Sequence, residues 1–293
     1  MDAHDHGLMQ DLEAMLKLKA DRRSSLRWLA LGAASLPMLG CGGTGDATTT
    51  TSTNSGTSSG TGTSSGTSTG TSTGTSAGSC AIIPEETAGP YPGDGTNSNG
   101  SSIVNVLTMS GIVRQDIRSS INGASGTALG IPLTIKLTIN DAKNSCALAS
   151  GFAVYLWHCD RDGNYSLYSS GVTNQNYLRG VQETNAAGEV TFTTIFPGCY
   201  AGRIPHVHFE VFPSLAKSTS VLNRIKTSQF TFPMSSLNEV YTDSGYSASV
   251  RNLAQISYAT DNVFSDGTAL QMSSVTGNLK EGYVATLSLN VSS

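Results

Sequence analysis

Two histidines and an arginine lie close together in one short stretch of the chain, and their spacing suggests a metal site. Arg203, His206 and His208 all belong to residues 200–212. Successive side chains of an extended strand point to opposite faces, so the two imidazoles would share one face. Apolar residues such as Val207 would occupy the other face. Only three of the five histidines lie beyond residue 40, and two of them form this pair. The pattern favours a metal site on the face that carries the two imidazoles.

Two tyrosines follow turn sequences that end predicted strands. Tyr165 comes directly after residues 161–164, and Tyr200 comes directly after residues 197–199. Loops at strand ends often carry functional groups. Taken singly, each tyrosine is expected to pack its ring and to bond its hydroxyl to the backbone. His158 has no partner at ligand spacing and is expected to be structural.

The elements that must position these residues are β-strands. Apolar and polar residues alternate in several short runs, and Gly, Asn, Asp and Pro separate the runs. No long helical period stands out beyond the linker described below. Strands are predicted over residues 131–139, 153–157, 189–195, 206–212, 229–232 and 283–291. The sequence therefore predicts an all-β fold, an antiparallel β-sandwich whose long loops form the site.

Composition limits the kinds of partner. The chain has 293 residues, with 17 Lys and Arg against 21 Asp and Glu, and its predicted folded part has no basic cluster. This balance argues against a nucleic-acid partner. About 210 residues remain for folding once the N-terminal segments are set aside, which is enough for one β domain over residues 80–293.

The N-terminal segments have the features of an exported lipoprotein. Residues 1–40 contain the pair Arg22 and Arg23 and then an apolar stretch too short to span a membrane. They are interpreted as an export signal of the twin-arginine type, with general export as the alternative route. The end of this segment resembles a bacterial lipobox, which predicts lipidation of Cys41. Residues 41–79 are rich in Gly, Ser and Thr and are interpreted as a flexible tether. The protein is expected in the periplasm or on the cell surface, anchored to a membrane.

Four further cysteines lie in the predicted domain. They are Cys80, Cys146, Cys159 and Cys199. An even number of cysteines in an exported protein suggests disulfides, and three pairings are possible. All four are expected to be structural.

Six short blocks of sequence carry a resemblance to a known family. They are residues 86–91, 156–160, 163–166, 178–180, 194–200 and 203–208. Together they resemble the intradiol ring-cleavage dioxygenases, and they occur in the order found in that family. The resemblance runs from about residue 82 to 212 of the chain. It implies an enzyme that opens catechol-type aromatic diols between the two hydroxyl-bearing carbons with O2, giving cis,cis-muconate-type diacids.

The resemblance also assigns metal ligands. It makes Tyr165, Tyr200, His206 and His208 the four protein ligands of a non-haem Fe(III) ion. Phenolate is a hard, anionic donor, and two phenolates favour a trivalent over a divalent ion. No organic cofactor is implied.

Further roles follow from the same resemblance. Tyr200 matches the ligand that is displaced when a diol binds, and Arg203 matches an arginine that stabilises negative charge on the bound ring. The alternative for Arg203 is a loop salt bridge. Pro90 and Tyr91 match a loop at the border of the substrate pocket, where Tyr91 could contact the ring or only pack the loop.

This sequence also departs from better-known members of that family. The interval from Tyr200 to His206 is short, and no N-terminal helical dimerisation segment is evident, so substrate preference and oligomeric state stay open. Two other classes of protein remain as alternatives. One is a non-catalytic β-sandwich binding module. The other is a cupin-type metal enzyme, for which Glu210 lies too close to the histidine pair and His158 lies upstream of it.

Overall fold

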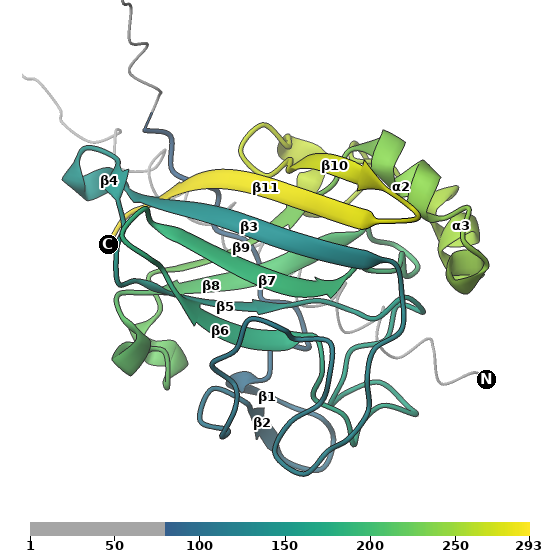
Figure 1. Ribbon diagram of the computed structural model, residues 1–293, viewed down its shortest axis with the longest axis horizontal. Helices are drawn as coiled ribbons and strands as arrows, with labels where there is room; N and C mark the ends of the chain where they lie inside the picture. The colour runs from purple at the N-terminus through teal and green to yellow at the C-terminus, as the bar shows by residue number, and fades with distance from the viewer. Residues whose placement is uncertain (1–79) are drawn as a thin grey trace, which may run out of the picture. The chain divides into compact units, whose positions relative to one another are not determined.

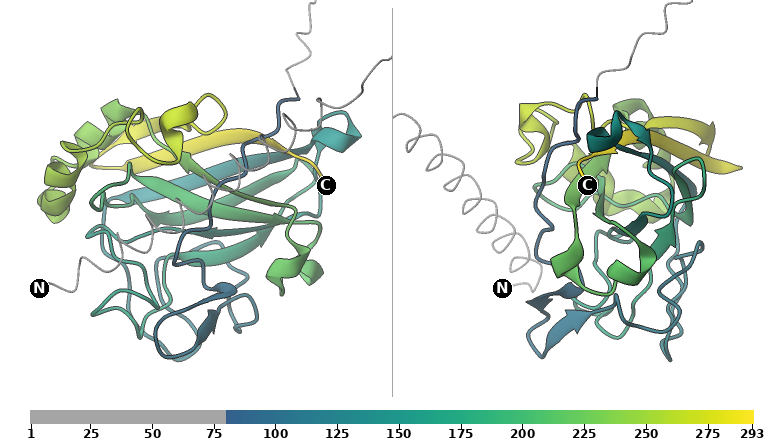
Figure 2. Two further views of the ribbon diagram at one scale, coloured as in Figure 1. Left: turned by 180° about the vertical axis from the view of Figure 1, so that it is seen from behind. Right: turned by 90° about the vertical axis from the view of Figure 1, so that its left-hand side faces the viewer.

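Two β-sheets that pack face to face form the centre of the described part of the chain (Figures 1 and 2). The computed structural model describes residues 80–293. The predicted export signal (residues 1–40), Cys41 and the predicted tether (residues 41–79) lie outside the described residues. Within residues 80–293, no helix is both long and apolar enough to cross a membrane.

The first sheet is built around a long central strand, β3. Its members are β10 (Ser274–Asn278), β11 (Gly282–Val291), β3 (Pro132–Asp141), β7 (Glu189–Ile195) and β4 (Ala147–Leu148). β7 and β4 pair antiparallel with one edge of β3, whereas β11 pairs parallel with the other edge. The predicted antiparallel sandwich is therefore confirmed except for this parallel pair, which Figure 1 shows side by side.

The second sheet carries the histidine pair. Its order is β6 (Arg179–Glu183), β5 (Ala153–Trp157), β8 (His206–Phe212) and β9 (Lys226–Thr231), and every pair is antiparallel. His208 lies opposite Trp157 on one side and Gln229 on the other. A separate hairpin of β1 (Asp94–Ser98) and β2 (Ile103–Asn105) belongs to neither sheet.

The main core lies between the two sheets. Alternate residues of β3 and β8, including Leu133, Ile135, Val207 and Phe209, are at most 1% exposed and belong to one apolar cluster. The predicted orientation of the two faces of β8 is confirmed, because Val207 and Phe209 pack in the core while the imidazoles project from the opposite face. A second apolar cluster, formed by β5, β6 and the loops near residues 106–112 and 165–168, covers that other face. The histidines are therefore buried under a layer of loops.

Short helices complete the described chain. The α-helices are α2 (Met234–Val240) and α3 (Ser247–Leu253); the 3-10 helices are η1 (Ala142–Asn144), η2 (Leu215–Lys217), η3 (Val221–Asn223), η4 (Ser244–Tyr246) and η5 (Phe264–Asp266). Two turns of helix are too short to leave a clear period in the sequence, and neither α-helix was predicted. Helices α2 and α3 lie at the end of the domain opposite β4, as Figure 1 and the left view of Figure 2 show.

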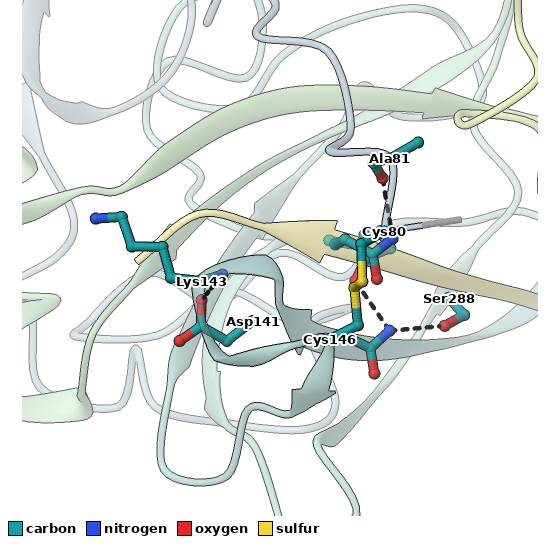
Figure 3. The surroundings of a disulfide bond; sticks show 9 residues. Cys80, Ala81, Asp141, Lys143, Cys146 and Ser288 are labelled. Carbon is teal, nitrogen blue, oxygen red and sulfur yellow. Dashed lines mark hydrogen bonds between the residues drawn. A yellow bond between two sulfur atoms is a disulfide. The ribbon is translucent and has the colours of Figure 1, made fainter. Parts of the chain in front are cut away.

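Of the four cysteines in the domain, only two are paired. Cys80 and Cys146 form a disulfide that joins the first described residue to the turn before β4 (Figure 3). Cys159 and Cys199 are free and buried, so the expectation of disulfides holds for one pair only. Their thiols instead contact backbone carbonyls, at 3.5 Å from Gly198 O and 3.4 Å from Arg203 O respectively. Burial raises the pKa of Cys199 to about 12 and that of Cys159 well above its usual value, so both stay protonated and structural.

Candidate metal centre

Four side chains predicted as metal ligands converge on one point. The Nε2 atom of His206 lies 3.1 Å from His208 Nε2, 3.3 Å from Tyr200 Oη and 3.4 Å from Tyr165 Oη. The two histidines come from the start of β8, and each tyrosine comes from a loop. The structure therefore brings all four residues together, with two nitrogens and two oxygens facing one another.

These separations suit ligands that share one metal ion. Ligands bound at about 2.1 Å, with angles of about 90 to 110° between them, lie about 3.0 to 3.4 Å apart. The three distances from His206 Nε2 fall in this range. The residues present therefore fit a metal with a mixed nitrogen and oxygen ligand set.

The tautomer of His206 leaves the correct nitrogen available to a metal. Its Nδ1 lies 2.6 Å from the carbonyl oxygen of Ile204. A carbonyl can only accept, so Nδ1 carries the proton and Nε2 presents its lone pair to the two tyrosines and His208. Burial, followed by the charge of Arg203, keeps the pKa of His206 well below its usual value. The ring is therefore neutral at physiological pH, as a metal ligand requires.

His208 is oriented mainly by ring contacts. Its imidazole stacks on the indole of Trp157, with centroids 4.9 Å apart and planes at 6°. The carbonyl of Thr87 lies near the ring, but His208 Nδ1 makes no well-formed hydrogen bond. Burial and the neighbouring His206 lower the pKa of His208 well below its usual value, so this ring is also neutral.

The loop that carries Tyr165 contacts the loop of Tyr200 at Gly163. Asp160 Oδ1 accepts hydrogen bonds from the backbone N–H groups of Asp162 and Asn164, which shapes the turn before Tyr165. Gly163 has a φ of +87°, and a Cβ there would lie 2.9 Å from the Cβ of Tyr200. Only glycine allows both the backbone conformation and this close approach.

The loop of Tyr200 is held from two sides. Gly198 N donates to the carbonyl of Asp160 at 3.0 Å, which joins the two tyrosine loops directly. On the other side, Ser249 and Asn252 of α3 bind the backbone of Cys199. The metal centre therefore lies at the α3 end of the domain, away from the Cys80–Cys146 disulfide.

Arg203 lies beside the ligands in a network of buried polar groups. It is 2% exposed, and its Nη1 lies 3.4 Å from His206 Nε2. Its Nη2 donates to Gln229 Oε1 at 2.7 Å, and its Nε donates to Asp261 Oδ2 at 3.0 Å. Arg203 therefore does form a salt bridge, as the alternative reading of its role expected, but it does so at the metal centre.

Two of these polar partners were not predicted from the sequence. Gln229 lies opposite His208 on β9, and Asp261 lies in a loop 58 residues after Arg203. A polar residue in a strand can be recognised only when its neighbours are known, and a loop aspartate resembles many others. An Asp followed by apolar Val263 and Phe264 is the one weak local signal of a buried turn.

The predicted substrate loop lies next to Tyr165. The ring of Tyr91 is 5.0 Å from the ring of Tyr165, and both Pro90 and Tyr91 are partly exposed. Arg179 ties this loop to the loop of Tyr165, because its Nη2 donates to the carbonyls of Tyr91 at 2.9 Å and Ser166 at 3.0 Å. The loop thus borders the metal centre, whichever of its residues would contact a substrate.

The remaining histidine and glutamate do not join the centre. His158 Nδ1 and Nε2 lie 2.7 Å from Cys159 O and Thr194 Oγ1 respectively, so His158 is structural as expected. Glu210 instead contacts Thr227 on β9. In the described part of the chain, no three His, Cys, Asp or Glu side chains form a group that could hold a metal. A cupin-type ligand set of histidines and a glutamate is therefore not found there.

Comparison with known proteins gives structural matches only. No protein-family model matches the sequence, and the comparison with curated proteins finds no match. An intradiol ring-cleavage dioxygenase from Tetranychus urticae is 25% identical, with a TM-score of 0.54, over 73% of this chain and 95% of that one. A second dioxygenase crystal structure is 24% identical, with the same TM-score and coverage. The dioxygenase domain of a carbohydrate-binding fusion protein from Streptomyces sp. SirexAA-E is 20% identical over 72% of this chain and 99% of that one, with a TM-score of 0.45.

Proposed function

Because this chain has the β-sandwich fold of the intradiol ring-cleavage dioxygenases, we propose that it is a non-haem iron dioxygenase. Its substrates would be catechol-type aromatic diols, cleaved between the two hydroxyl-bearing carbons. One observation carries the proposal: the convergence of Tyr165, Tyr200 and His208 on the lone pair of His206. The fold by itself would not specify this chemistry.

The four converging side chains would hold ferric iron. Two phenolate oxygens and two neutral imidazoles form a mixed set that suits a hard, trivalent ion. When bound, the iron would withdraw electron density from a chelated diol and make its ring reactive toward dioxygen. The proposal needs no reductant or organic cofactor.

The two tyrosines differ in their access to solvent, and this suggests different roles. Tyr165 is 2% exposed, whereas Tyr200 is partly exposed and precedes the exposed residues Ala201 and Gly202. A diol that enters from solvent can therefore reach Tyr200 more easily. We assign Tyr200 Oη as the group that accepts a proton from a substrate hydroxyl, while Tyr165 stays in place.

Arg203 would act on charge in the substrate. Its Nη1 lies 3.4 Å from His206 Nε2, so its cation lies beside the atoms that would bind the metal. Removing protons from a diol leaves negative charge on its oxygens, which is partly delocalised into the ring and would be stabilised by the cation. A fixed cation in a buried site is well suited to this, because it needs no reorganisation during the reaction.

The loop of Pro90 and Tyr91 would border the substrate. Tyr91 packs against Tyr165 and is held through its carbonyl by Arg179. Its partly exposed ring could therefore lie along one side of a bound diol and limit the access of water. The short interval from Tyr200 to His206 is where we expect substrate preference to differ from that of enzymes with a longer loop.

We also propose that the protein works outside the cytoplasm, as a lipoprotein anchored at Cys41. The proposal rests on residues 1–79 of the sequence. The Cys80–Cys146 disulfide supports it, since disulfides persist in oxidising compartments.

Labelled dioxygen tests the proposed reaction. The full chain, loaded with ferric iron, is incubated with catechol and 18O2, and the product is examined by mass spectrometry. We expect a cis,cis-muconate-type diacid with one 18O atom in each new carboxyl group, because one carbon–carbon bond breaks and both oxygen atoms enter the product. His206→Ala should abolish its formation. A semialdehyde, or a product without label from 18O2, would show that the proposed reaction is wrong.

A further inference from the structure

Asp261 is a fully buried carboxylate whose oxygens accept four hydrogen bonds. Oδ2 accepts from Arg203 Nε at 3.0 Å and from the backbone N–H of Ile204 at 2.8 Å. Oδ1 accepts from the backbone N–H groups of Val263 at 2.8 Å and Phe264 at 3.2 Å. The side chain is 0% exposed, and its charge is balanced by the guanidinium of Arg203.

Only a carboxylate satisfies all four of these donors. An asparagine of the same shape has one acceptor oxygen and one NH2 group. If its oxygen faced Arg203 and Ile204, its NH2 would face the N–H groups of Val263 and Phe264. In the opposite orientation, its NH2 would face Arg203 and Ile204. Either way two buried donors would meet another donor, so the position specifically requires an aspartate.

Asp261 reaches the metal centre by two routes. The first passes through Arg203, because Asp261 fixes the Nε edge of Arg203, whose Nη1 lies 3.4 Å from His206 Nε2. The second passes through Ile204. Asp261 holds the N–H of Ile204, and the carbonyl of the same residue accepts the Nδ1 proton of His206 at 2.6 Å. That bond selects the tautomer that presents Nε2 to the other ligands.

We infer that Asp261 is a positioning residue of the proposed dioxygenase site, which holds both the Arg203 cation and the His206 tautomer in place. The inference rests on the proposed function for its catalytic consequence only. Asp261 lies far along the chain from Tyr200 and His206. Its carboxylate binds Arg203 and Ile204, which belong to the short loop between these two ligands. The ion pair with Arg203 also explains how a cation can be buried next to the ligands, since an unpaired buried charge is strongly unfavourable.

The test uses Asp261→Asn in the full chain. The control is Glu210→Gln. Like Asp261, Glu210 has a fully buried carboxyl group, but it lies on β8 and contacts Thr227 instead of Arg203. In the iron-free protein, 15N NMR of the histidine rings should show a single Nδ1-protonated tautomer for His206 in the wild type and in the control. In Asp261→Asn we expect a second, Nε2-protonated form, together with loss of the slowly exchanging Arg203 Nε–H signal.

The iron-loaded proteins give a second readout. Partners that orient metal ligands typically contribute about 10- to 100-fold to activity or metal affinity. We expect Asp261→Asn to lower kcat/KM by about this factor, mainly through kcat, because Arg203 would act on charge that develops during the reaction. Glu210→Gln should stay within about twofold of the wild type. The NMR readout needs no activity, so it decides the inference even if the proposed reaction is wrong.

Two results would overturn the inference. One is an Asp261→Asn protein with the wild-type His206 tautomer and a protected Arg203 Nε–H. The other comes from the unaltered protein, which keeps the test decisive if the variant does not fold. There, Arg203 Nε–H should exchange far more slowly than Arg118 Nε–H, whose ion pair with Asp116 is exposed. Equal exchange rates would show that Asp261 does not hold Arg203.

Discussion

Removal of the Cys80–Cys146 disulfide is expected to lower the free energy of unfolding by about 4 kcal/mol. The two residues are 66 positions apart. In the chain-entropy relation, a closed loop of this size restricts the unfolded chain by about 15 cal/mol/K, which is about 4 kcal/mol at 25 °C. Other contacts keep the folded ends together without the bond. Asn290 donates to the carbonyl of Ala81, and Asn140 donates to Ser288 on the neighbouring strand. The effect should therefore arise mainly in the unfolded state.

The assay is urea unfolding of the full chain, followed by circular dichroism, for the wild type and for Cys80→Ser with Cys146→Ser. In thermal unfolding of the same proteins, a loss of about 4 kcal/mol corresponds, for a domain of this size, to a fall in Tm of about 8 to 16 °C. Reductant should destabilise the wild type to the level of the double variant and leave the variant unchanged, because Cys159 and Cys199 are already free. The reasoning is refuted if the double variant stays within about 1 kcal/mol of the wild type.

Two further predictions concern Glu210 and the N-terminal cysteine. Burial, followed by the charge of Asp94, raises the pKa of Glu210 from 4.5 to about 8. The folded state then keeps a proton that the unfolded state releases, so this group makes the protein less stable as pH rises from 4.5 to about 8. The free energy of unfolding of Glu210→Gln, relative to that of the wild type, should therefore increase by a few kcal/mol between pH 5 and pH 9 in urea unfolding. Parallel pH profiles of the two proteins would contradict this. For the proposed lipoprotein, Cys41→Ala should move the protein from the membrane to the soluble fraction of fractionated cells, and unchanged membrane association would count against lipidation.

Local patterns in the sequence predicted six of the eleven strands in the described part of the chain, together with the histidine pair. The alternation of Leu133, Ile135 and Leu137 has the period of a half-buried strand, and the spacing of His206 and His208 places both on one face of β8. Such patterns depend on near neighbours, which the sequence displays directly. Convergence of the four ligands followed from the resemblance, and the structure shows the glycine contacts that make it possible.

Features that depend on residues far apart in the chain were not predictable in this way. The parallel pairing of β11 with β3 joins Tyr283 to Leu133, and no local pattern specifies such a partner. The choice of Cys80 and Cys146 among three possible pairings depends on the same kind of distant contact. Asp261 was missed because its role appears only when its loop is folded against Arg203.

The direct test of the central claim is the visible spectrum of the full chain loaded with ferric iron, together with an iron assay. Two tyrosinate ligands should give one iron per chain and a strong charge-transfer band. Tyr165→Phe should shift or abolish the band. Tyr283→Phe should leave it unchanged, because Tyr283 lies on β11, in the sheet that does not carry the histidine pair. A colourless protein that cannot be loaded with iron would contradict the account and would favour a non-catalytic binding module on the same fold.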